Sequence, residues 1–487
     1  MKSMKRILVV VMAVVGLCAA AQIDRPKLIV GLVVDQMRWD YLYNYQWGEG
    51  GFQTLLSDGY RCNNTIIDYV PTVTAAGHAT IFSGTTPAFH GIAGNNFMLN
   101  GKNVTSVQDG SVKAVGGNEK TKGKSPRNLI TTNIADQLLL ATNFKSRTVG
   151  IALKDRAAIL PSGHHPIGAY WFDKGSSSFV TSTYYMDKLP RWVSDFNKKN
   201  HDKLSTDLNN TPMGTIMTFA LAEQALISER LGQGEVTDML TVSVSNTDMC
   251  AHYYGSHSPQ VDSIYWQLDK ELAHFIDVLD QRIGRGNYLL FLTADHGGTH
   301  SYPRMTANGL PSGCWHNPDA LVAANAELEK QFGVKKLLKE EMEYTFYLDR
   351  EAIDDAHLDY DVVMRAACKA LELPEEIQWA IDVANIDSYP IPTILKERIK
   401  LGYFPERSGE IYVVPRTGVY AGKTEWSGSN HGSWSQSDSH IPLIFMGWHI
   451  TPGETSRLTH MTDIAATVCA MLHIQAPNAC IGTPIFE

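Results

Sequence analysis

The sequence predicts an α/β fold: a doubly wound, mostly parallel central sheet with an inserted cap. Three observations lead to this fold class: near-continuous apolar runs, amphipathic segments between them, and polar residues directly after each run. Runs of Val, Ile and Leu are typical of parallel strands that helices cover on both faces. Ligands of such sheets bind beyond the carboxyl ends of the strands, so the polar residues predict one shared site.

The predicted strands each lead into a chemically useful side chain. Residues 28–34 end at Asp35, and residues 147–153 end at Lys154. Residues 239–244 run toward Asp248, and residues 288–292 run toward the Asp295–His296 pair. The sequence therefore expects these side chains to meet at one edge of the sheet.

The helices between the strands carry recognisable signals. Ser258 is a natural N-cap, with Pro259 at the first helical position. An apolar face at helical spacing continues from there until Gly284 and Gly286. Residues 463–472 predict a last helix near the end of the chain. This alternation of strands and helices supports the doubly wound architecture.

The middle of the chain has a different pattern. Residues 302–420 combine acidic loops, prolines and a Glu/Lys-rich stretch at 327–343 that predicts helix. We interpret 302–420 as a cap inserted in a catalytic core formed by 22–301 and 421–487. Residues 96–128, rich in Gly, Asn, Ser and Lys, predict a smaller surface insertion in that core.

The first 21 residues predict a cleaved signal peptide. Lys2, Lys5 and Arg6 precede an apolar run, and the small residues 19–21 form a cleavage site. Removing the three cations moves the formal charge from −9 to −12. The mature protein is therefore expected in the periplasm or outside the cell. A lipoprotein anchor on Cys18 is the weaker alternative, because the bulky Leu17 precedes it.

Composition excludes several classes of partner. No Lys/Arg-rich stripe is present, which argues against nucleic acid. No later segment has the 18 consecutive apolar residues of a membrane helix, which argues against stable membrane insertion. Six cysteines remain after the signal peptide, and none forms a CxxC motif of a thiolate zinc site. Cys469 and Cys480 are the pair to test first for a disulfide.

Each of these polar residues has a purely structural explanation when it is considered alone. Asp35 could cap a helix, and Asp248-x-x-x-His252 could be an incidental helical pair. Asp295–His296 could form a turn, and a lone loop histidine such as His431 is usually structural. Together, however, these residues supply the oxygen and imidazole ligands that suit zinc. They suffice for two ions, and a two-ion site stabilises the attacking and leaving oxygens of an in-line displacement at phosphorus.

A hydroxyl group is the expected nucleophile, because no cysteine stands at a strand tip. Residues 71–78, which contain Thr74, predict a turn that enters a helix. A hydroxyl there gains from the positive end of the helix dipole, and a metal would give it alkoxide character. The alternative role for Thr74 is a simple N-cap.

These motifs, in this order, resemble the alkaline phosphatase superfamily. The closest resemblance is to bacterial alkaline phosphatases with a threonine nucleophile, whose core is shared with nucleotide pyrophosphatase/phosphodiesterases. The motifs are Val34-Asp35-Gln36, Pro71-Thr72-Val73-Thr74-Ala75, Gly94-Asn95-Asn96, Lys154-Asp155-Arg156, Thr247-Asp248-x-x-x-His252, Ala294-Asp295-His296-Gly297 and Asn430-His431-Gly432. The resemblance covers nearly the whole core and leaves mainly the cap unmatched.

The resemblance implies two zinc ions and a covalent intermediate. Asp248, His252 and His431 would hold one ion. The other ion would be held by Asp35, Thr74, Asp295 and His296. Thr74 would become a phosphothreonine that water then hydrolyses, and Asn95 would donate hydrogen bonds to a phosphoryl oxygen.

Lys154 and Arg156 distinguish between subfamilies. They stand two apart after a predicted strand, so both should face the site while Asp155 points away. An ammonium and a guanidinium match the charge of a monoester dianion. Diesterases that resemble this family lack the pair, whereas a solvated charge run is the structural alternative. The predicted substrates are therefore small-molecule phosphate monoesters.

Several alternatives stay open on the sequence. The first is a phosphodiesterase or nucleotide pyrophosphatase on the same metal core. A sulfatase is disfavoured by the missing formylglycine motif, and a mutase by the signal peptide. From another class, a non-catalytic zinc-stabilised binding protein would be expected to lack a ligand or the nucleophile. The physiological ester, the role of the cap and the oligomeric state are not set by the sequence.

Overall fold

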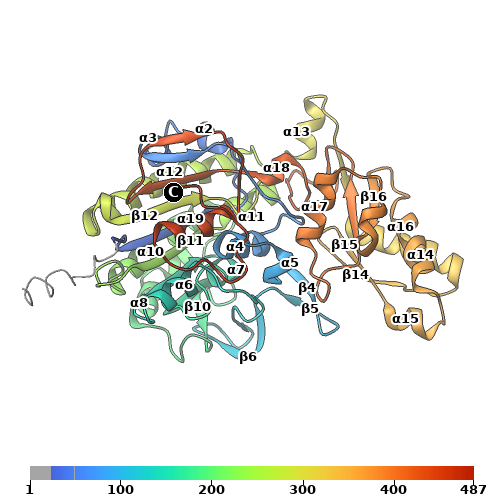
Figure 1. Cartoon of the computed structure of the whole chain (residues 1–487), viewed down its shortest axis with the longest axis horizontal. Helices are drawn as coiled ribbons and strands as arrows, with labels where there is room; N and C mark the ends of the chain where they lie inside the picture. The colour runs from blue at the N-terminus through green and yellow to red at the C-terminus, as the bar shows by residue number, and fades with distance from the viewer. Residues whose placement is uncertain (1–23, 49, 487) are drawn as a thin grey trace, which may run out of the picture.

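The computed structural model describes residues 24–48 and 50–486. The predicted signal peptide and Cys18 lie outside these residues. The molecule has two lobes: a large one built on the central sheet and a smaller one built by the middle of the chain (Figure 1). Among the described residues, no helix is both long and apolar enough to cross a membrane.

An 11-stranded sheet forms the centre of the large lobe. In spatial order its strands are β21 (Gly453–Thr455), β2 (Gly59–Cys62), β20 (Leu443–Gly447), β12 (Tyr288–Thr293), β1 (Leu28–Val34), β11 (Asp238–Val244), β8 (Thr148–Ala152), β9 (Gly168–Asp173), β10 (Ser178–Ser182), β6 (Gln108–Val115) and β7 (Lys122–Lys124). The strands from β12 to β9 pair in parallel, whereas β20 pairs antiparallel with β12 and β10 pairs antiparallel with β9. The predicted α/β class is confirmed, and the four predicted strands lie at the centre of the sheet.

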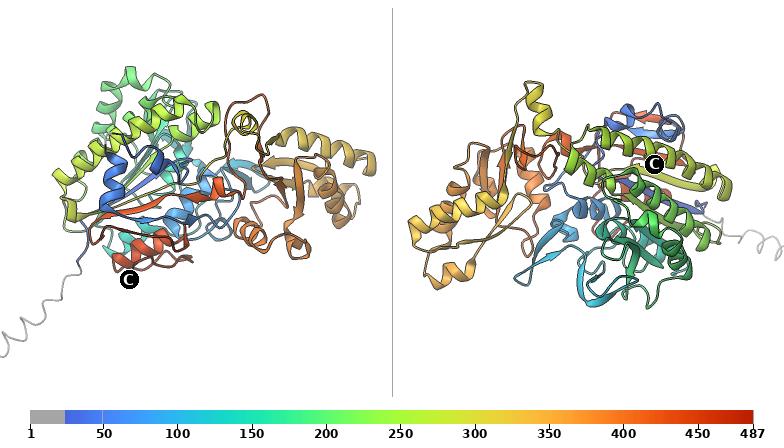
Figure 2. Two further views of the ribbon diagram at one scale, coloured as in Figure 1. Left: turned by 90° about the horizontal axis from the view of Figure 1, so that it is seen from above. Right: turned by 180° about the vertical axis from the view of Figure 1, so that it is seen from behind.

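Helices cover both faces of this sheet. One layer contains α3 (Gly51–Asp58), α10 (Pro212–Ser228), α11 (Asn246–Tyr254) and α12 (Pro259–Arg282). The other contains α4 (Thr74–Ser83), α6 (Ile134–Ala141), α7 (Asp155–Ile159) and α19 (Asp463–Met471). Viewed from above, α10 and α12 lie on one side of the sheet and α19 on the other (Figure 2). The Ser258 hydroxyl accepts a hydrogen bond from the Val261 amide at 3.3 Å, as expected of its predicted N-cap role.

Shorter elements complete the large lobe. They are α2 (Tyr41–Asn44), α5 (Pro87–His90), α8 (Arg191–Lys199), α9 (His201–Leu204), α18 (Gln436–Ser439), η1 (Arg285–Asn287), and a small sheet of β19 (His440–Ile441), β3 (Thr65–Ile66) and β22 (Thr459–His460). The stretch predicted as a surface insertion contains the hairpin β4 (Asn96–Leu99) and β5 (Lys102–Thr105), followed by β6 and β7. Since β6 pairs with β10, this stretch extends the central sheet at one edge.

The second lobe has its own four-stranded sheet and its own apolar core. Its strands are β14 (Leu338–Met342), β15 (Thr345–Leu348), β17 (Ile411–Pro415) and β16 (Ile377–Asp382). Its helices are α13 (Tyr302–Ala307), α14 (Asn317–Phe332), α15 (Arg350–Asp355), α16 (Tyr360–Leu371), η2 (Val383–Ser388) and α17 (Thr393–Gly402), and β13 (Gly313–Trp315) pairs with β18 (Val419–Ala421). Phe346, Leu395 and Val413 are buried in this second core.

One local prediction in the second lobe is wrong. The Glu/Lys-rich stretch at 327–343 was expected to be helical, but α14 ends at Phe332 and residues 338–342 form β14. Gly333 ends the helix with φ of 73°, a left-handed conformation that glycine adopts easily. Leu338 then packs in the second core, Met342 is buried as well, and the acidic residues between them stay partly exposed. Packing in the sheet thus outweighs the helix propensity of Glu and Lys.

The six described cysteines are free thiols, so the Cys469–Cys480 disulfide is not formed in this structure. The Cys480 sulfur lies close to Gly84, where a Cβ atom would approach it to 2.5 Å.

Candidate active site

Two parallel strands beside β1 bring the predicted metal ligands together. Val34 stands opposite Val244 of β11, and Val33 stands opposite Thr293 of β12. Asp35 follows β1 directly, and Asp295 comes two residues after β12. Asp248 is the third residue of α11, which begins just after β11. The carboxyl ends of three neighbouring strands therefore place three buried carboxylates at one edge.

The histidines of the site are held in one common manner. The Nδ1 atoms of His252, His296 and His431 lie 3.0, 2.9 and 2.7 Å from the backbone carbonyls of Ser429, Gly297 and Thr72. Because carbonyls only accept hydrogen bonds, each Nδ1 carries the proton and donates it. Each Nε2 lone pair is then directed into the carboxylate cluster. Metal-binding histidines are typically oriented in this way.

The ring nitrogens face the same carboxylates. Nε2 of His252 and Nε2 of His431 lie 3.1 and 3.5 Å from Oδ1 of Asp248. Nε2 of His296 lies 3.6 Å from Oδ1 of Asp35. The His296 and His431 rings stack with centroids 3.6 Å apart. Burial lowers the pKa of His296 to about 3, so this ring is neutral and able to bind a cation.

The three carboxylates carry more negative charge than the protein neutralises. Oδ1 of Asp35, Oδ1 of Asp248 and Oδ2 of Asp295 are buried without a hydrogen-bond partner. Burial and the repulsion from Asp295 raise the pKa of Asp35 well above its usual value. Burial alone would raise the pKa of Asp248, but His252 and Lys154 outweigh it and hold that pKa well below the usual value. Such orphaned, mutually repelling oxygens fit a site for cations.

The ligand atoms form two groups that share Asp248. One group contains Asp248, His252 and His431, and the other contains Asp35, Asp248 and His296. The first has the same three residues as one predicted zinc set. The second group contains Asp248, whereas the predicted set contained Asp295. The Asp295 carboxylate is nevertheless adjacent, with Oδ2 at 3.5 Å from Nε2 of His296.

Thr74 is the first residue of α4 and lies beside this cluster. Val73 is the N-cap, so the N-cap alternative for Thr74 does not hold. The Thr74 side chain is buried, with Oγ1 3.5 Å from Nε2 of His296 and 3.2 Å from Nζ of Lys154. The N-terminus of a helix carries partial positive charge, which favours an anion at this hydroxyl.

Lys154 and Arg156 are positioned by a different element from the one that the sequence predicted. Strand β8 ends at Ala152, Lys154 is the N-cap of α7, and Arg156 lies inside that helix. The expectation that strand alternation aligns Lys154 with Arg156 is therefore wrong. As predicted, Asp155 points elsewhere: its carboxylate pairs with Lys124 of β7 at 3.0 Å.

Lys154 lies at the centre of the cluster. Its Nζ donates to Oδ2 of Asp35 at 2.6 Å and to Oδ2 of Asp248 at 2.5 Å. Burial lowers the pKa of Lys154, but the attraction of Asp248 and Asp35 outweighs it and raises that pKa overall. The nearby Arg156 guanidinium opposes this rise, and its Nε is buried without a partner. Lys154 is thus a firmly charged cation in contact with Thr74 and both ligand groups.

Asn95 faces the start of α4 from the loop before β4. Its side-chain Oδ1 accepts a hydrogen bond from the Ala75 amide at 3.0 Å, one residue beyond Thr74. Its own backbone amide donates to Glu343 of the second lobe. All ten predicted site residues therefore lie at this edge of the sheet or in the loops around it.

Sequence reasoning missed two residues of this region. His78 is buried, and its Nδ1 lies 3.3 Å from Oδ2 of Asp295 and 2.9 Å from the Thr74 carbonyl. The spacing of four residues from Thr74 on one helix face was the available signal. Glu343 was missed because it comes from a distant lobe whose sequence carries no motif.

Comparisons with known proteins place this site in a family. A family model described as type I phosphodiesterase/nucleotide pyrophosphatase matches residues 29–437. The alkaline phosphatase PafA of Elizabethkingia meningoseptica is 40% identical, with 99% of this chain and 98% of that protein covered. A crystal structure of PafA superposes with a TM-score of 0.90 at 40% identity, covering 95% of this chain and 99% of that one.

Two further relatives are similar over nearly their whole length. The alkaline phosphatase PhoV of Synechococcus elongatus is 38% identical, covering 96% of this chain and 93% of that protein. A Myroides odoratus protein named calcium-transporting ATPase is 40% identical, covering 96% of both chains.

Proposed function

The chain belongs to the type I phosphodiesterase/nucleotide pyrophosphatase family of the alkaline phosphatase superfamily, and we propose that it is a zinc-dependent phosphatase that hydrolyses phosphate monoesters through Thr74. The observation that carries the proposal is the position of Nζ of Lys154. This cation contacts the Thr74 hydroxyl, Asp35 and Asp248 at once, at 3.2, 2.6 and 2.5 Å. The nucleophile, the anion-binding cation and both ligand groups thus form one site.

The residues present fit two zinc ions. Asp248, His252 and His431 would hold one ion, and Asp35, Thr74, Asp295 and His296 would hold the other. Imidazoles oriented by backbone carbonyls and orphaned carboxylate oxygens are the ligands that zinc prefers. When bound, two zinc ions supply Lewis-acid stabilisation for the oxygens that enter and leave the phosphorus.

Thr74 is the proposed nucleophile. The hydroxyl stands at the N-terminus of α4 with the Lys154 ammonium 3.2 Å away, and both favour the negatively charged form of its oxygen. Attack by this oxygen on phosphorus forms a phosphothreonine and releases the alcohol. Water then hydrolyses the phosphothreonine and releases phosphate. Burial of Thr74 restricts the water that can reach the reacting atoms.

Asn95, Lys154 and Arg156 are the proposed phosphoryl-binding residues. Because the Asn95 side-chain oxygen is occupied by the Ala75 amide, the Asn95 side-chain nitrogen is the group left to donate to a phosphoryl oxygen. Lys154 and Arg156 supply two positive charges beside it. A monoester dianion carries more charge on its phosphoryl oxygens than a diester, so this set favours monoesters. The names of PafA and PhoV support the same substrate class.

A phosphodiesterase or nucleotide pyrophosphatase is the second candidate, favoured by the description of the family model. It would use the same ligand groups and Thr74 but depend little on Lys154 and Arg156. The name of the Myroides relative adds ATP to the substrates worth assaying. Three further features belong to the proposal: export by residues 1–21, a periplasmic or secreted location, and a cap formed by residues 302–420.

The experiment measures zinc content and substrate preference of the purified mature protein. We expect two zinc ions per chain and a kcat/KM for an aryl phosphate at least about 100-fold above that for the bis-aryl phosphate, since two cations would contact the dianion. A preference for the diester would replace the monoesterase assignment with the second candidate. A protein without activity on either ester would support the non-catalytic alternative.

A further inference from the structure

A hairpin of the second lobe reaches the active-site edge of the core. Met342 of β14 pairs with Thr345 of β15, so Glu343 and Tyr344 form a two-residue turn. Their φ angles are 50° and 74°, as in the type I′ turns that Asn and Gly usually form. Side chains other than Gly and Asn are strained there, so this turn persists only because surrounding contacts hold it.

Tyr344 fixes one side of the tip. The side chain is buried, its backbone carbonyl accepts from the Val413 amide at 2.9 Å, and its hydroxyl accepts from the Ala421 amide at 2.9 Å. The ring packs on Gly432, where a Cβ atom would come within 2.8 Å of the Tyr344 ring. Gly432 follows His431, so the tip rests directly on a loop that carries a proposed zinc ligand.

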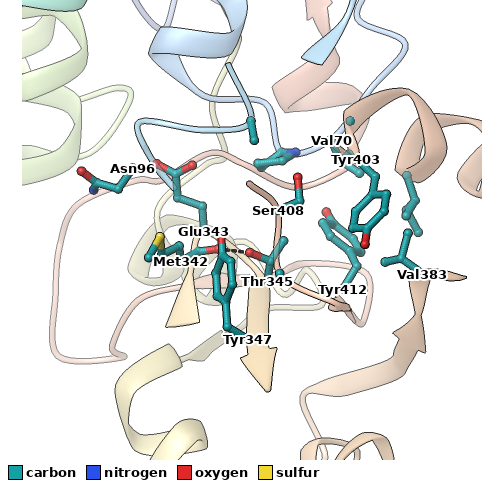
Figure 3. A pocket seen from close by; sticks show the side chains of 15 residues that line it. Val70, Asn96, Met342, Glu343, Thr345, Tyr347, Val383, Tyr403, Ser408 and Tyr412 are labelled. Atoms are coloured by element: carbon teal, nitrogen blue, oxygen red, sulfur yellow. Dashed lines mark hydrogen bonds between the residues drawn. The ribbon is translucent and has the colours of Figure 1, made fainter. Parts of the chain in front are cut away.

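Glu343 occupies the other side of the tip and reaches the phosphoryl-binding loop. Its two carboxylate oxygens accept from the Asn95 backbone amide at 3.0 and 3.2 Å. A Cβ atom at Gly94 would lie 2.4 Å from Oε2 of Glu343, so a larger residue there would have to displace this carboxylate. Figure 3 shows Glu343 rising from the hairpin tip toward the core loop that carries Asn96. The carboxylate thus contacts the loop from the side of the second lobe.

The contact continues through Asn95 to the nucleophile. The backbone amide of Asn95 is fixed by Glu343, and its side-chain oxygen is fixed by the Ala75 amide at 3.0 Å. Ala75 directly follows Thr74. With both groups held, the orientation of the remaining side-chain nitrogen is determined by the second lobe and α4 together.

We propose that Glu343 is a positioning residue for phosphoryl transfer: from the second lobe, it holds the Asn95 loop so that the Asn95 side-chain amide faces the phosphoryl oxygen. This inference rests on the proposed function, because it takes Asn95 as a phosphoryl ligand. Glu343 acts through Asn95 and not on the substrate. The second lobe would therefore contribute to the monoester site through this contact.

Glutamate suits this position by its length and its acceptor atoms. A carboxylate accepts more strongly than an amide oxygen, but either can receive the single Asn95 N–H. Glu343→Gln therefore keeps the contact, Glu343→Asp withdraws the acceptor by one methylene, and Glu343→Ala removes it. Glu340→Ala, on the same strand of the hairpin, is the matched control.

The test is a double-mutant cycle between Glu343 and Asn95 in the zinc-loaded enzyme. Loss of the hydrogen bond that holds the Asn95 amide predicts that Glu343→Ala lowers kcat/KM for an aryl phosphate about 10- to 100-fold. Glu343→Gln should stay within about threefold of the wild type, Glu343→Asp should resemble Glu343→Ala, and Glu340→Ala should change nothing. In an Asn95→Ala background, Glu343→Ala should cost less than about twofold. Zinc content should stay constant throughout.

Two results would overturn the proposal. One is an equal fractional loss from Glu343→Ala with and without Asn95, which would show a role that does not pass through Asn95. The other is a Glu343→Gln variant as impaired as Glu343→Ala. If Glu343→Ala does not fold, Glu343→Asp takes its place in the cycle with the same criteria. Failure of the proposed function is seen separately, as a wild-type enzyme that prefers the diester.

Discussion

The site has two halves that are built in different ways. The proposed metal half, with Asp35, Asp248, Asp295 and the three histidines, comes entirely from residues outside 302–420. The proposed phosphoryl half, with Asn95, Lys154 and Arg156, stands on a loop and a helix start that other segments brace. Strand ends and backbone carbonyls orient the metal half, whereas a strained hairpin tip from the second lobe holds Asn95. Only the Asn95 part of the proposed phosphoryl half therefore depends on a contact from the second lobe, since Lys154 and Arg156 stand at α7 of the large lobe.

Charge separates the halves as well. The metal half has orphaned carboxylate oxygens and needs cations, whereas the phosphoryl half presents cations and amide hydrogens to an anion. In this structure Lys154 joins them, because its ammonium contacts Asp35 and Asp248. Two bound zinc ions would neutralise those carboxylates and leave Lys154 free to bind the phosphoryl group.

The largest effect is expected where the halves meet, at Thr74. Thr74→Ala should lower kcat/KM about 10⁴-fold or more, because the covalent route is lost. Folding and zinc content should stay largely intact, since the carboxylates and histidines remain. Steady-state kinetics with metal analysis checks both expectations. Full activity of this variant would eliminate the phosphothreonine mechanism.

The next effect isolates the phosphoryl half. Lys154→Ala combined with Arg156→Ala should lower aryl phosphate hydrolysis about 1000-fold but bis-aryl phosphate hydrolysis about tenfold or less, because the dianion loses more charge stabilisation. The ratio of the two kcat/KM values is the measurement. Equal losses on both esters would show that this pair does not determine the preference.

A smaller effect tests the contact between the lobes. Gly94→Ala places a methyl group 2.4 Å from the Glu343 carboxylate and 3.0 Å from the Asn96 carbonyl. Displacing the Glu343 carboxylate from the Asn95 amide should lower monoester kcat/KM about tenfold and leave zinc content unchanged. Gly110→Ala is the control, since a Cβ atom there meets nothing within 4 Å. Similar kinetics for the two variants would argue against a close fit between the tip and the loop.

The smallest effect concerns His164, which belongs to neither half. Its Nδ1 lies 2.8 Å from Asp136; burial lowers the pKa of His164, but this partner outweighs it and raises that pKa above 6.5. The folded protein thus binds the proton more tightly than the unfolded chain. The resulting stability is full below pH 6.5 and disappears as the pH rises through the raised value.

His164→Gln should therefore reduce the free energy of unfolding by about 1 kcal/mol at pH 5.5 and by nearly nothing at pH 9. Thermal or urea unfolding at the two pH values measures the difference. Monoester kcat/KM should not change, which separates a loss of stability from a loss of positioning. A larger destabilisation at pH 9 than at pH 5.5 would contradict the assigned pKa direction.

The metal half could be predicted from sequence, because its residues follow apolar runs whose carboxyl ends must meet in a parallel sheet. Asp35, Asp248 and the Asp295–His296 pair were found in this way. The phosphoryl half was harder. Lys154 and Arg156 were expected at the site because of strand alternation, which is wrong, since β8 ends before them and α7 carries Arg156.

The contribution of the second lobe could not be predicted. Residues 338–342 have the composition of a helix, and only the buried faces of Leu338 and Met342 make them a strand. Glu343 adopts a positive φ that glutamate rarely has, so the conformational preference of this residue gave no indication of a turn here. Its partner Asn95 is 248 residues away in the chain, and no spacing rule connects them.

The most direct test of the two-half site is a crystal structure of the zinc-loaded protein with orthovanadate, recorded at the zinc absorption edge. We expect two zinc peaks, one beside His252 and His431 and one beside Asp35 and His296. We also expect vanadium next to Oγ1 of Thr74, with Asn95, Lys154 and Arg156 on the vanadate oxygens. A single zinc peak, or vanadate bound elsewhere while Lys154 stays paired with Asp35 and Asp248, would contradict the account.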